Sequence, residues 1–133
     1  MKTSLLLLAF ATMFFTGCSS PESVSHMQGR GATEVYDAGF DRVWSAAVAA
    51  AQQGDLQILR VDKTHGFICT KRGLGPQSFG ENVAIWIRKV KSNQTSVEVV
   101  SRQAGPPVLV LRSWEHRILN CISANLTTDT PVS

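Results

Sequence analysis

NVAIWIRKVKSNQTSVEVVSR, residues 82–102, is the segment from which the fold is most clearly predicted. Val83, Ile85 and Ile87 form one apolar series, and the residues between them form a second, more mixed series. The same spacing of two recurs after a short polar break, in residues 95–102. A period of two with a covered face and a wetter face is typical of antiparallel strands. The segment therefore predicts a β-hairpin.

Outward from this hairpin, the chain contains further strands and two amphipathic helices. Residues 63–66, Lys-Thr-His-Gly, predict a turn, because glycine accepts the positive φ that a tight hairpin needs. The helix pattern is clearest after Phe40, where apolar residues recur at steps of three and four. The predicted elements are strands at residues 33–37, 56–62, 66–72, 82–91 and 95–102 and helices at residues 40–53 and 113–126.

This order, strand-helix-strand-strand-strand-strand-helix, predicts an α+β domain with two layers. We expect an antiparallel sheet of about four to five strands, with both helices covering one of its faces. The chain of 133 residues is long enough for one such domain. On this prediction Trp86 lies on the face turned away from the helices, beside Ala84 and Val100.

The first twenty residues are typical of an export signal. Lys2 precedes an apolar run over residues 5–15, and small residues then lead to Cys18. This is the order of a secretory signal, and the run is shorter than the roughly 20 residues that span a bilayer. Residues 15–18, Phe-Thr-Gly-Cys, resemble the lipobox of bacterial lipoproteins, with Phe where the motif usually has Leu. Cys18 is therefore the expected site of lipid attachment.

The export signal sets the expected division of the chain and the expected state of its cysteines. We expect a lipoprotein signal peptide at residues 1–17, a flexible Ser- and Gly-rich tether at 18–32, a single α+β domain at 33–126 and a loose tail at 127–133. An exported chain enters a compartment that allows disulfides. Cys69 and Cys121 are therefore expected either to pair or to be two small buried residues.

The middle of the chain resembles a family of bacterial envelope lipoproteins. The run FDRVWSAA at residues 40–47 is followed by LQILRVDK at 56–63 and by HGFI at 65–68. This pattern is similar to the small lipoprotein domains related to BamC (NlpB), an accessory component of the outer-membrane β-barrel assembly machinery. The resemblance covers roughly residues 33–126 and implies a fold without a catalytic residue. The resemblance to lipoproteins, with Ser19 after the cysteine, implies an outer-membrane location facing the periplasm, because the family's usual sorting rule retains Asp at that position in the inner membrane.

The sequence offers little that indicates catalysis or cofactor binding. His26, His65 and His116 have no carboxylate, serine or cysteine at a spacing that indicates a nucleophile and its base. The glycine-rich residues 73–80 lead into a predicted strand and lack the lysine of a phosphate-binding loop. We therefore expect no enzyme activity, no cofactor and no metal site. The net charge of only +3 and the export signal argue against nucleic-acid binding.

Four residues are candidates for contact with a partner: Trp86, Phe79, Arg88 and Lys89. Trp86 has apolar neighbours on the open sheet face, which is typical of an interface, unless the tether or the loop near Phe79 folds over it. Arg88 and Lys89 belong to a basic edge of adjacent hairpins. Such an edge either contacts anionic envelope material or, more commonly, serves solubility and blocks edge pairing.

Two functions from different classes follow. The main expectation is a membrane-anchored, periplasm-facing lipoprotein that acts as a non-enzymatic binding or accessory module for another envelope component. Its partners would be the membrane, through the N-terminal lipid, and an envelope protein. The alternative is a small-ligand or glycan-binding domain of the helix-grip type, which needs a cavity lined by a few convergent polar groups.

Overall fold

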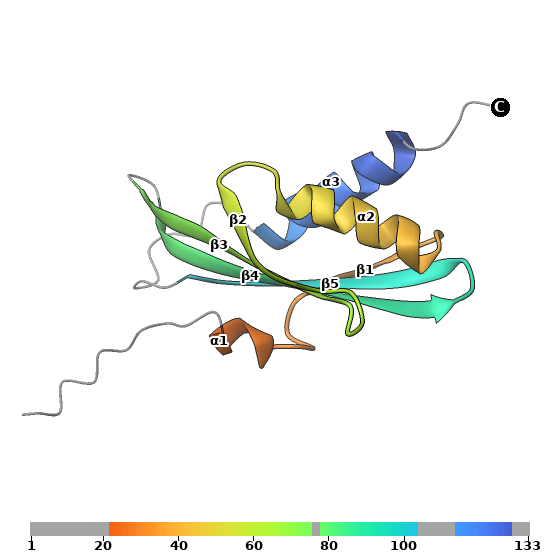
Figure 1. Ribbon diagram of the computed structural model, residues 1–133, viewed down its shortest axis with the longest axis horizontal. Coiled ribbons are helices and arrows are strands. Elements are labelled where there is room, and N and C mark those ends of the chain that lie inside the picture. Colours follow the sequence, from red (N-terminus) through yellow and green to blue (C-terminus); the bar gives the residue numbers. More distant parts are fainter. Residues whose placement is uncertain (1–21, 76–77, 104–113, 129–133) are drawn as a thin grey trace, which may run out of the picture.

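The chain forms one antiparallel sheet with two long helices on one face and a short helix on the other (Figure 1). The structure, a computed structural model, describes residues 22–75, 78–103 and 114–128. The helices are α1 (Glu22–Ser25), α2 (Phe40–Ala51) and α3 (Trp114–Thr128), and the strands are β1 (Ala32–Tyr36), β2 (Leu56–Asp62), β3 (Phe67–Gly75), β4 (Ser78–Lys91) and β5 (Gln94–Gln103). The strands lie in the order β1-β5-β4-β3-β2. The predicted α+β class and the predicted order of elements are confirmed.

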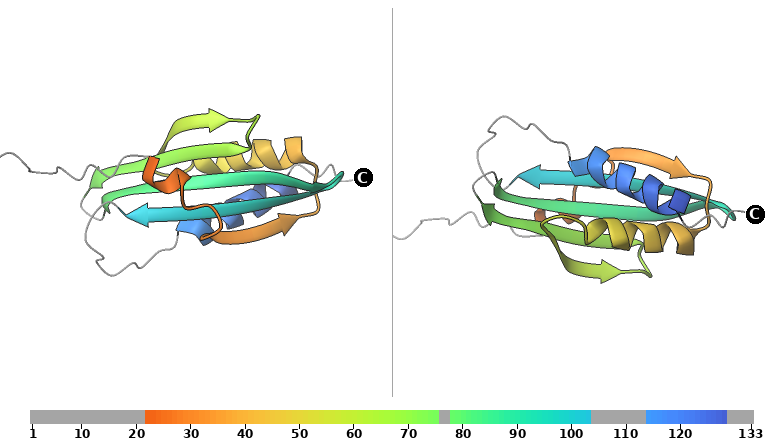
Figure 2. Two further views of the ribbon diagram at one scale, coloured as in Figure 1. Left: turned by 90° about the horizontal axis from the view of Figure 1, so that it is seen from below. Right: turned by 90° about the horizontal axis from the view of Figure 1, so that it is seen from above.

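The main core lies between the sheet and the helices α2 and α3. Ile85 and Ile87 of β4 point into it and are almost fully buried, together with the apolar stripes of both helices. Figure 2 shows α2 across the middle of the sheet and α3 beside it, where α3 contacts β5 and β1. The Tyr36 hydroxyl donates to the Leu119 carbonyl oxygen at 2.9 Å, which ties β1 to α3. Burial raises the pKa of Tyr36, so the phenol keeps the proton that this bond requires.

The segment expected to be a flexible tether is folded from Glu22 onward. Helix α1 contacts β4 and β5 on the face opposite α2 and α3 (Figure 2). Val24, which is fully buried, and Met27 pack against a second apolar cluster on that face. The backbone N–H groups of Gly29 and Gly31 donate to Glu98 Oε1 at 2.5 and 3.1 Å. These contacts fix residues that composition alone assigns to a linker.

We expect Val24→Ala to lower the free energy of unfolding by about 2 kcal/mol, because it removes buried methyl groups and leaves a cavity under α1. Urea denaturation followed by circular dichroism measures this change. Val35→Ala is the matched control, since Val35 is 51% exposed on the edge strand β1 and should cost less than about 0.5 kcal/mol. Equal stability of Val24→Ala and the parent chain would mean that α1 does not cover the sheet.

Several element boundaries differ from the prediction. The expected loop at residues 73–81 is largely strand, because β3 and β4 continue to pair from Arg72–Glu81 to Leu74–Phe79. Backbone pairing needs no apolar alternation, so the sequence pattern does not report it. Helix α3 continues to Thr128, into the expected tail, with the Thr127 and Thr128 hydroxyls bonded to carbonyl oxygens four residues earlier. Residues 129–133 lie outside the described residues.

Gly66 ends the turn between β2 and β3 in a position that only glycine fits. Its φ is +64°, in the left-handed region. Its N–H donates to the Lys63 carbonyl oxygen, and its own carbonyl oxygen accepts from the Ile87 N–H at 2.7 Å. A Cβ on this residue would collide with the Ile87 carbonyl oxygen, which is backbone and cannot move aside. The turn glycine predicted from the sequence therefore also allows the close approach of β4.

Gly66→Ala should lower the free energy of unfolding by about 3 kcal/mol, from left-handed backbone strain and the backbone collision together. Gly73→Ala serves as the control, because its Cβ would meet nothing within 4 Å, and we expect it to change stability by less than about 0.5 kcal/mol. Thermal or chemical unfolding of the two variants gives the comparison. Equal stability of the two variants would contradict the collision and the backbone strain expected at residue 66.

Candidate functional site

A cavity of about 440 Å³ opens on the outer sheet face, the face that carries α1. Residues from α1 and its following loop, from β2 and its turn, and from β3 and β4 line it. The lining residues are Ser25, Gln28, Arg60, Asp62, His65, Phe67, Trp86 and Arg88. Its volume falls within the range of about 300–1,000 Å³ that small-molecule sites occupy.

Phe67 and Trp86 form the floor of the cavity. They are cross-strand partners in β3 and β4, and their ring centroids lie 5.5 Å apart at an interplanar angle of 49°. Both rings are mostly buried, at 9% and 8% exposure, in the cluster that Val24 completes. The small part of each side chain that stays exposed therefore belongs to a ring that packing holds in place. Rigid aromatic binding surfaces are built in this way.

One wall of the cavity is a hydrogen-bonded group around Asp62. Its Oδ2 lies 3.3 Å from Arg60 Nη2 and 2.8 Å from His65 Nδ1, and its Oδ1 accepts from the His65 backbone N–H at 3.1 Å. The side-chain bond from His65 is the main reason that the pKa of Asp62 lies below its usual range. The Arg60 guanidinium also lies 5.8 Å from the Phe67 ring centroid, above its face. Arg60 is thus held over the aromatic floor.

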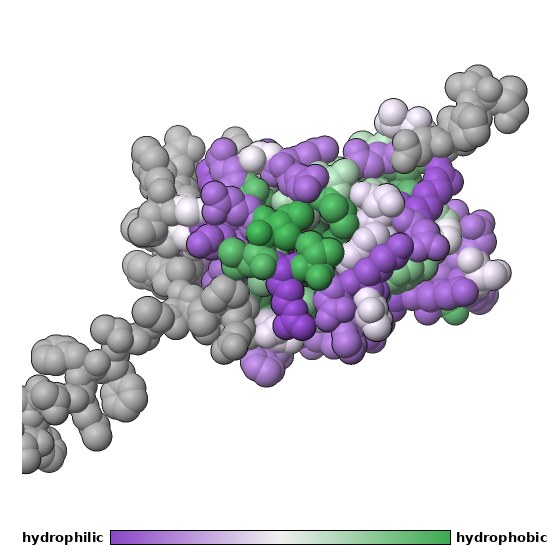
Figure 3. Space-filling view, viewed as in Figure 1, coloured by the Kyte–Doolittle hydropathy of each residue, from purple (hydrophilic) through white to green (hydrophobic). Residues whose placement is uncertain are grey.

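A β-bulge in β2 brings Arg60 and Asp62 to this face. The pairing between β2 and β3 shifts between Ile58 and Arg60, so Ile58 packs on the helix side while Arg60 lies over Phe67 on the other side. Without the bulge, strict alternation would place both residues on one face. The shift also leaves Leu59 at 39% and Val61 at 48% exposure, and Figure 3 shows apolar surface gathered in this region of β2.

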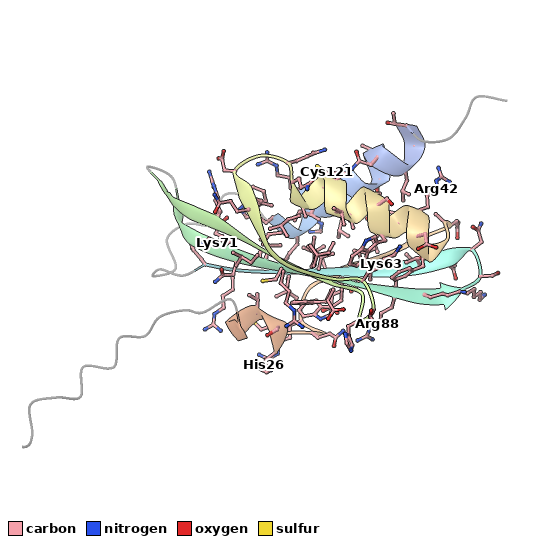
Figure 4. All side chains as sticks on the ribbon, in the orientation of Figure 1. His26, Arg42, Lys63, Lys71, Arg88 and Cys121 are labelled. Carbon is pink, nitrogen blue, oxygen red and sulfur yellow. The ribbon has the colours of Figure 1, made fainter. Side chains whose placement is uncertain are left out.

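The four predicted contact residues are separated by the structure. Trp86 and Arg88 lie two positions apart on β4 and both line the cavity, and Figure 4 shows Arg88 on the side of α1. Lys89 belongs to the opposite alternation. The pKa of Asp41 on α2 is lowered mainly by the side-chain hydrogen bond from Lys63, and the charge of Lys89 adds a smaller contribution. Phe79 pairs with Leu74 through the backbone, and its side chain lies outside the described residues.

Of the two alternatives for Trp86, an open aromatic surface or a ring covered by the tether or the loop near Phe79, the structure has the covered ring. At 8% exposure it lies in the cluster with Val24 and Met27, so the alternative, that the tether folds over it, is what the structure has. The apolar residues of the tether and those of the sheet face cover one another, since either would otherwise meet water. Only the part of Trp86 that borders the cavity is available to a ligand.

Cys69 and Cys121 lie on opposite sides of the sheet and are both free. Cys69 is buried in the cluster under α1, whereas Cys121 packs against the main core from α3, and Figure 4 shows Cys121 on the helix side. The expected disulfide is therefore not formed, because the sheet separates the two thiols. The other expectation, two small residues in apolar settings, describes them better. Cys18 lies outside the described residues.

In a Cys18→Ser background, we expect Cys121 to react with Ellman's reagent at pH 8 about tenfold faster than Cys69 or more. Cys69 is only 3% exposed, and burial raises the pKa of its thiol, so little thiolate is available for attack. Mass mapping of the modified peptides assigns each thiol. A disulfide-linked Cys69–Cys121 peptide, or faster modification of Cys69, would contradict the structure.

The sequence reasoning missed Arg60, Asp62, His65 and Gln28 as members of one site. The sequence places His65 in a turn and gives it no catalytic partner, and the bulge that turns Arg60 outward has no signal in the apolar pattern. The only local signal was the spacing of Asp62 and His65, three residues apart across a predicted turn, which favours a side-chain hydrogen bond. In the described ranges, no group of three or more His, Cys, Asp or Glu side chains is placed to hold a metal. Those ranges also contain no helix of the length and apolarity that a bilayer crossing requires.

Comparisons with known proteins give a likeness in fold. No family model matches the sequence, and no curated protein matches it. A solved structure of the di-domain aromatase/cyclase StfQ from the steffimycin biosynthetic pathway is similar, with a TM-score of 0.54 and 13% identity, over 73% of this chain and 43% of that one. The aromatase/cyclase ZhuI from Streptomyces sp. R1128 also matches, with a TM-score of 0.39 and 14% identity, over 74% of this chain and 86% of that one. This chain thus spans less than half of the StfQ chain, and at 13% identity the likeness shows a shared fold.

This likeness corrects the expectations that followed from the BamC resemblance. The similar structure with a TM-score of 0.54 is an aromatase/cyclase, so the assignment to BamC-like lipoproteins is wrong. The expected outer-membrane location facing the periplasm, inferred from the lipobox and Ser19, is corrected as well, because the similar structure is an aromatase/cyclase of a biosynthetic pathway. The expectation of no enzyme activity is contradicted as well, because the chain shares its fold with an aromatase/cyclase, and this likeness extends to the fold alone. What the likeness and the structure together show is the fold, an α+β domain with one antiparallel sheet.

Proposed function

We propose that this chain binds a small organic molecule in the cavity on the outer sheet face. The observation that carries the proposal is a cavity of ligand size, about 440 Å³, with Phe67 and Trp86 as its floor and polar groups on its walls. Small-molecule sites combine apolar or aromatic walls with a few placed polar groups in the same way. The rings are held by packing before any ligand arrives, which lowers the entropic cost of binding.

A second cavity, of about 330 Å³, lies on the helix side near the end of β1 and is the competing site. Its polar groups are largely engaged within the protein. The Tyr36 hydroxyl is bonded to Leu119 O, and Arg42 Nη2 donates to Leu126 O at 2.7 Å. A ligand in the second cavity would have to break these hydrogen bonds, which costs free energy. Binding on the aromatic floor of the outer cavity carries no such cost. We therefore place the ligand in the outer cavity.

The likeness to StfQ supports a ligand-binding role only through the fold. StfQ is a di-domain aromatase/cyclase of a biosynthetic pathway, so its domain architecture is compatible with the handling of small molecules. The proposed site lies on the face opposite α3, where the bulge in β2 and the short α1 leave an opening. The likeness to StfQ therefore says nothing about the residues of this site.

The full chain, labelled with ¹⁵N, should bind naphthalene-based probes at this cavity. Titration with 2-naphthalenemethanol and with naphthalene-2-carboxylate should shift the indole N–H resonance of Trp86, which a Trp86→Phe variant assigns. The resonance of Trp44, buried in the main core at 7% exposure, should stay in place. Shifts around Tyr36 and Thr127 instead of Trp86 would move the site to the second cavity.

A matched pair of variants tests the location. Gln28→Trp places a large side chain on a residue that lines the cavity, whereas His26→Trp makes the same change on an exposed residue next to α1 that does not line it. We expect Gln28→Trp to weaken probe binding by about tenfold or more, since it fills the space over the floor. His26→Trp should bind as the parent does. Equal binding by both variants would overturn the proposed site.

A further inference from the structure

We infer that the ligand of the outer cavity carries an anionic group, which Arg88 binds while a planar apolar part lies on Trp86 and Phe67. This inference rests on the proposed function and names the chemical class of the ligand, a planar aromatic acid. It goes beyond the shape of the cavity because it depends on the balance of charge around the aromatic floor.

The charges that line the cavity do not cancel. Asp62 is its one acidic lining residue, and that carboxylate is engaged by Arg60 at 3.3 Å and by His65 at 2.8 Å. Arg88 is left as a cation with no ion pair among the described residues. The lining therefore has a surplus positive charge beside an aromatic surface, and an anion is the ligand that neutralises it.

The neighbours of Arg88 in the sheet explain why no carboxylate of the described residues takes this place. The cross-strand partner of Arg88 in β5 is the neutral Ser96. The nearest acidic residue along β5 is Glu98, opposite Trp86. Its Oε1 already accepts the N–H groups of Gly29 and Gly31 and so holds the segment after α1. Among the described residues, Asp62 and Glu98 are thus both engaged within the protein, and Arg88 remains available.

The geometry suits an aromatic acid in particular. Trp86 and Arg88 are two residues apart on β4, so their side chains project from the same face of the sheet. A guanidinium presents paired N–H donors that match a carboxylate, which a lysine ammonium does not. A ligand with a ring joined to a carboxylate can therefore cover the aromatic edges and reach Arg88 together. A neutral ring lacks the second contact.

The test compares two probes that differ only in charge, naphthalene-2-carboxylate and naphthalene-2-carboxamide, on the full chain. Affinities are measured from the Trp86 indole resonance. We expect the carboxylate to bind about tenfold more tightly than the carboxamide, and Arg88→Gln to abolish that preference, because a charge-assisted bond is lost. Raising NaCl from about 50 to 500 mM should weaken only the carboxylate.

Arg102→Gln is the matched control. Arg102 is exposed on β5, does not line the cavity, and follows Val100 by two positions on the same face. It removes the same charge from the protein and should leave the preference intact. An equal loss in Arg102→Gln, or an unchanged preference in Arg88→Gln, would overturn the inference.

The two proposals fail in different ways. Equal affinity of the two probes at the Trp86 resonance would leave the binding site standing and would refute the anionic ligand. Absence of any shift at Trp86 with either probe would refute the site, and the inference with it. Since Arg88 is exposed on the sheet, Arg88→Gln is expected to fold, and an unchanged Trp86 resonance in the free variant verifies this.

Discussion

The structure depends on the burial of β4 on both of its faces. Ile85 and Ile87 point to one side and are at most 2% exposed, whereas Ala84 and Trp86 point to the other and are at most 8% exposed. Because side chains alternate along a strand, a single layer of helices covers only half of this strand. Helices α2 and α3 bury the first set, and α1 with its following loop buries the second. The segment before β1 is therefore part of the fold.

The candidate site lies at the border of the outer-face area that α1 and its following loop bury. Helix α1 has four residues and contacts β4 and β5, and the cavity opens beside it, toward β2 and the turn that follows β2. The bulge at Leu59 directs Arg60 and Asp62 to that opening, and Gly66 allows the turn carrying His65 to approach β4. The inner face differs, because described side chains of both helices and the sheet form one apolar core there, and the polar groups of its cavity near the end of β1 are bonded within the protein. The candidate site on the outer face therefore lies where α1 and its following loop leave that face uncovered.

The corrected assignment shows what an apolar pattern reports. The run at residues 40–47 and the hairpin pattern after it describe a helix that packs on a hairpin, and this geometry occurs in many α+β domains. The pattern was read as a BamC-like lipoprotein, and the likeness in fold is to an aromatase/cyclase. Periodicity specifies which side chains are buried. It does not distinguish families that bury them in the same arrangement.

The sequence by itself determined the class, the order of elements and the two faces of β4, including the place of Trp86 opposite the helices. These follow from local period and turn chemistry, which act over a few residues. Only the tertiary structure decided that residues 22–31 dock, that Cys69 and Cys121 are separated by the sheet, and that Arg60 and Arg88 share one cavity. Each of these depends on contacts between residues distant in the chain, or on a one-residue shift in pairing. A local apolar pattern carries no record of either.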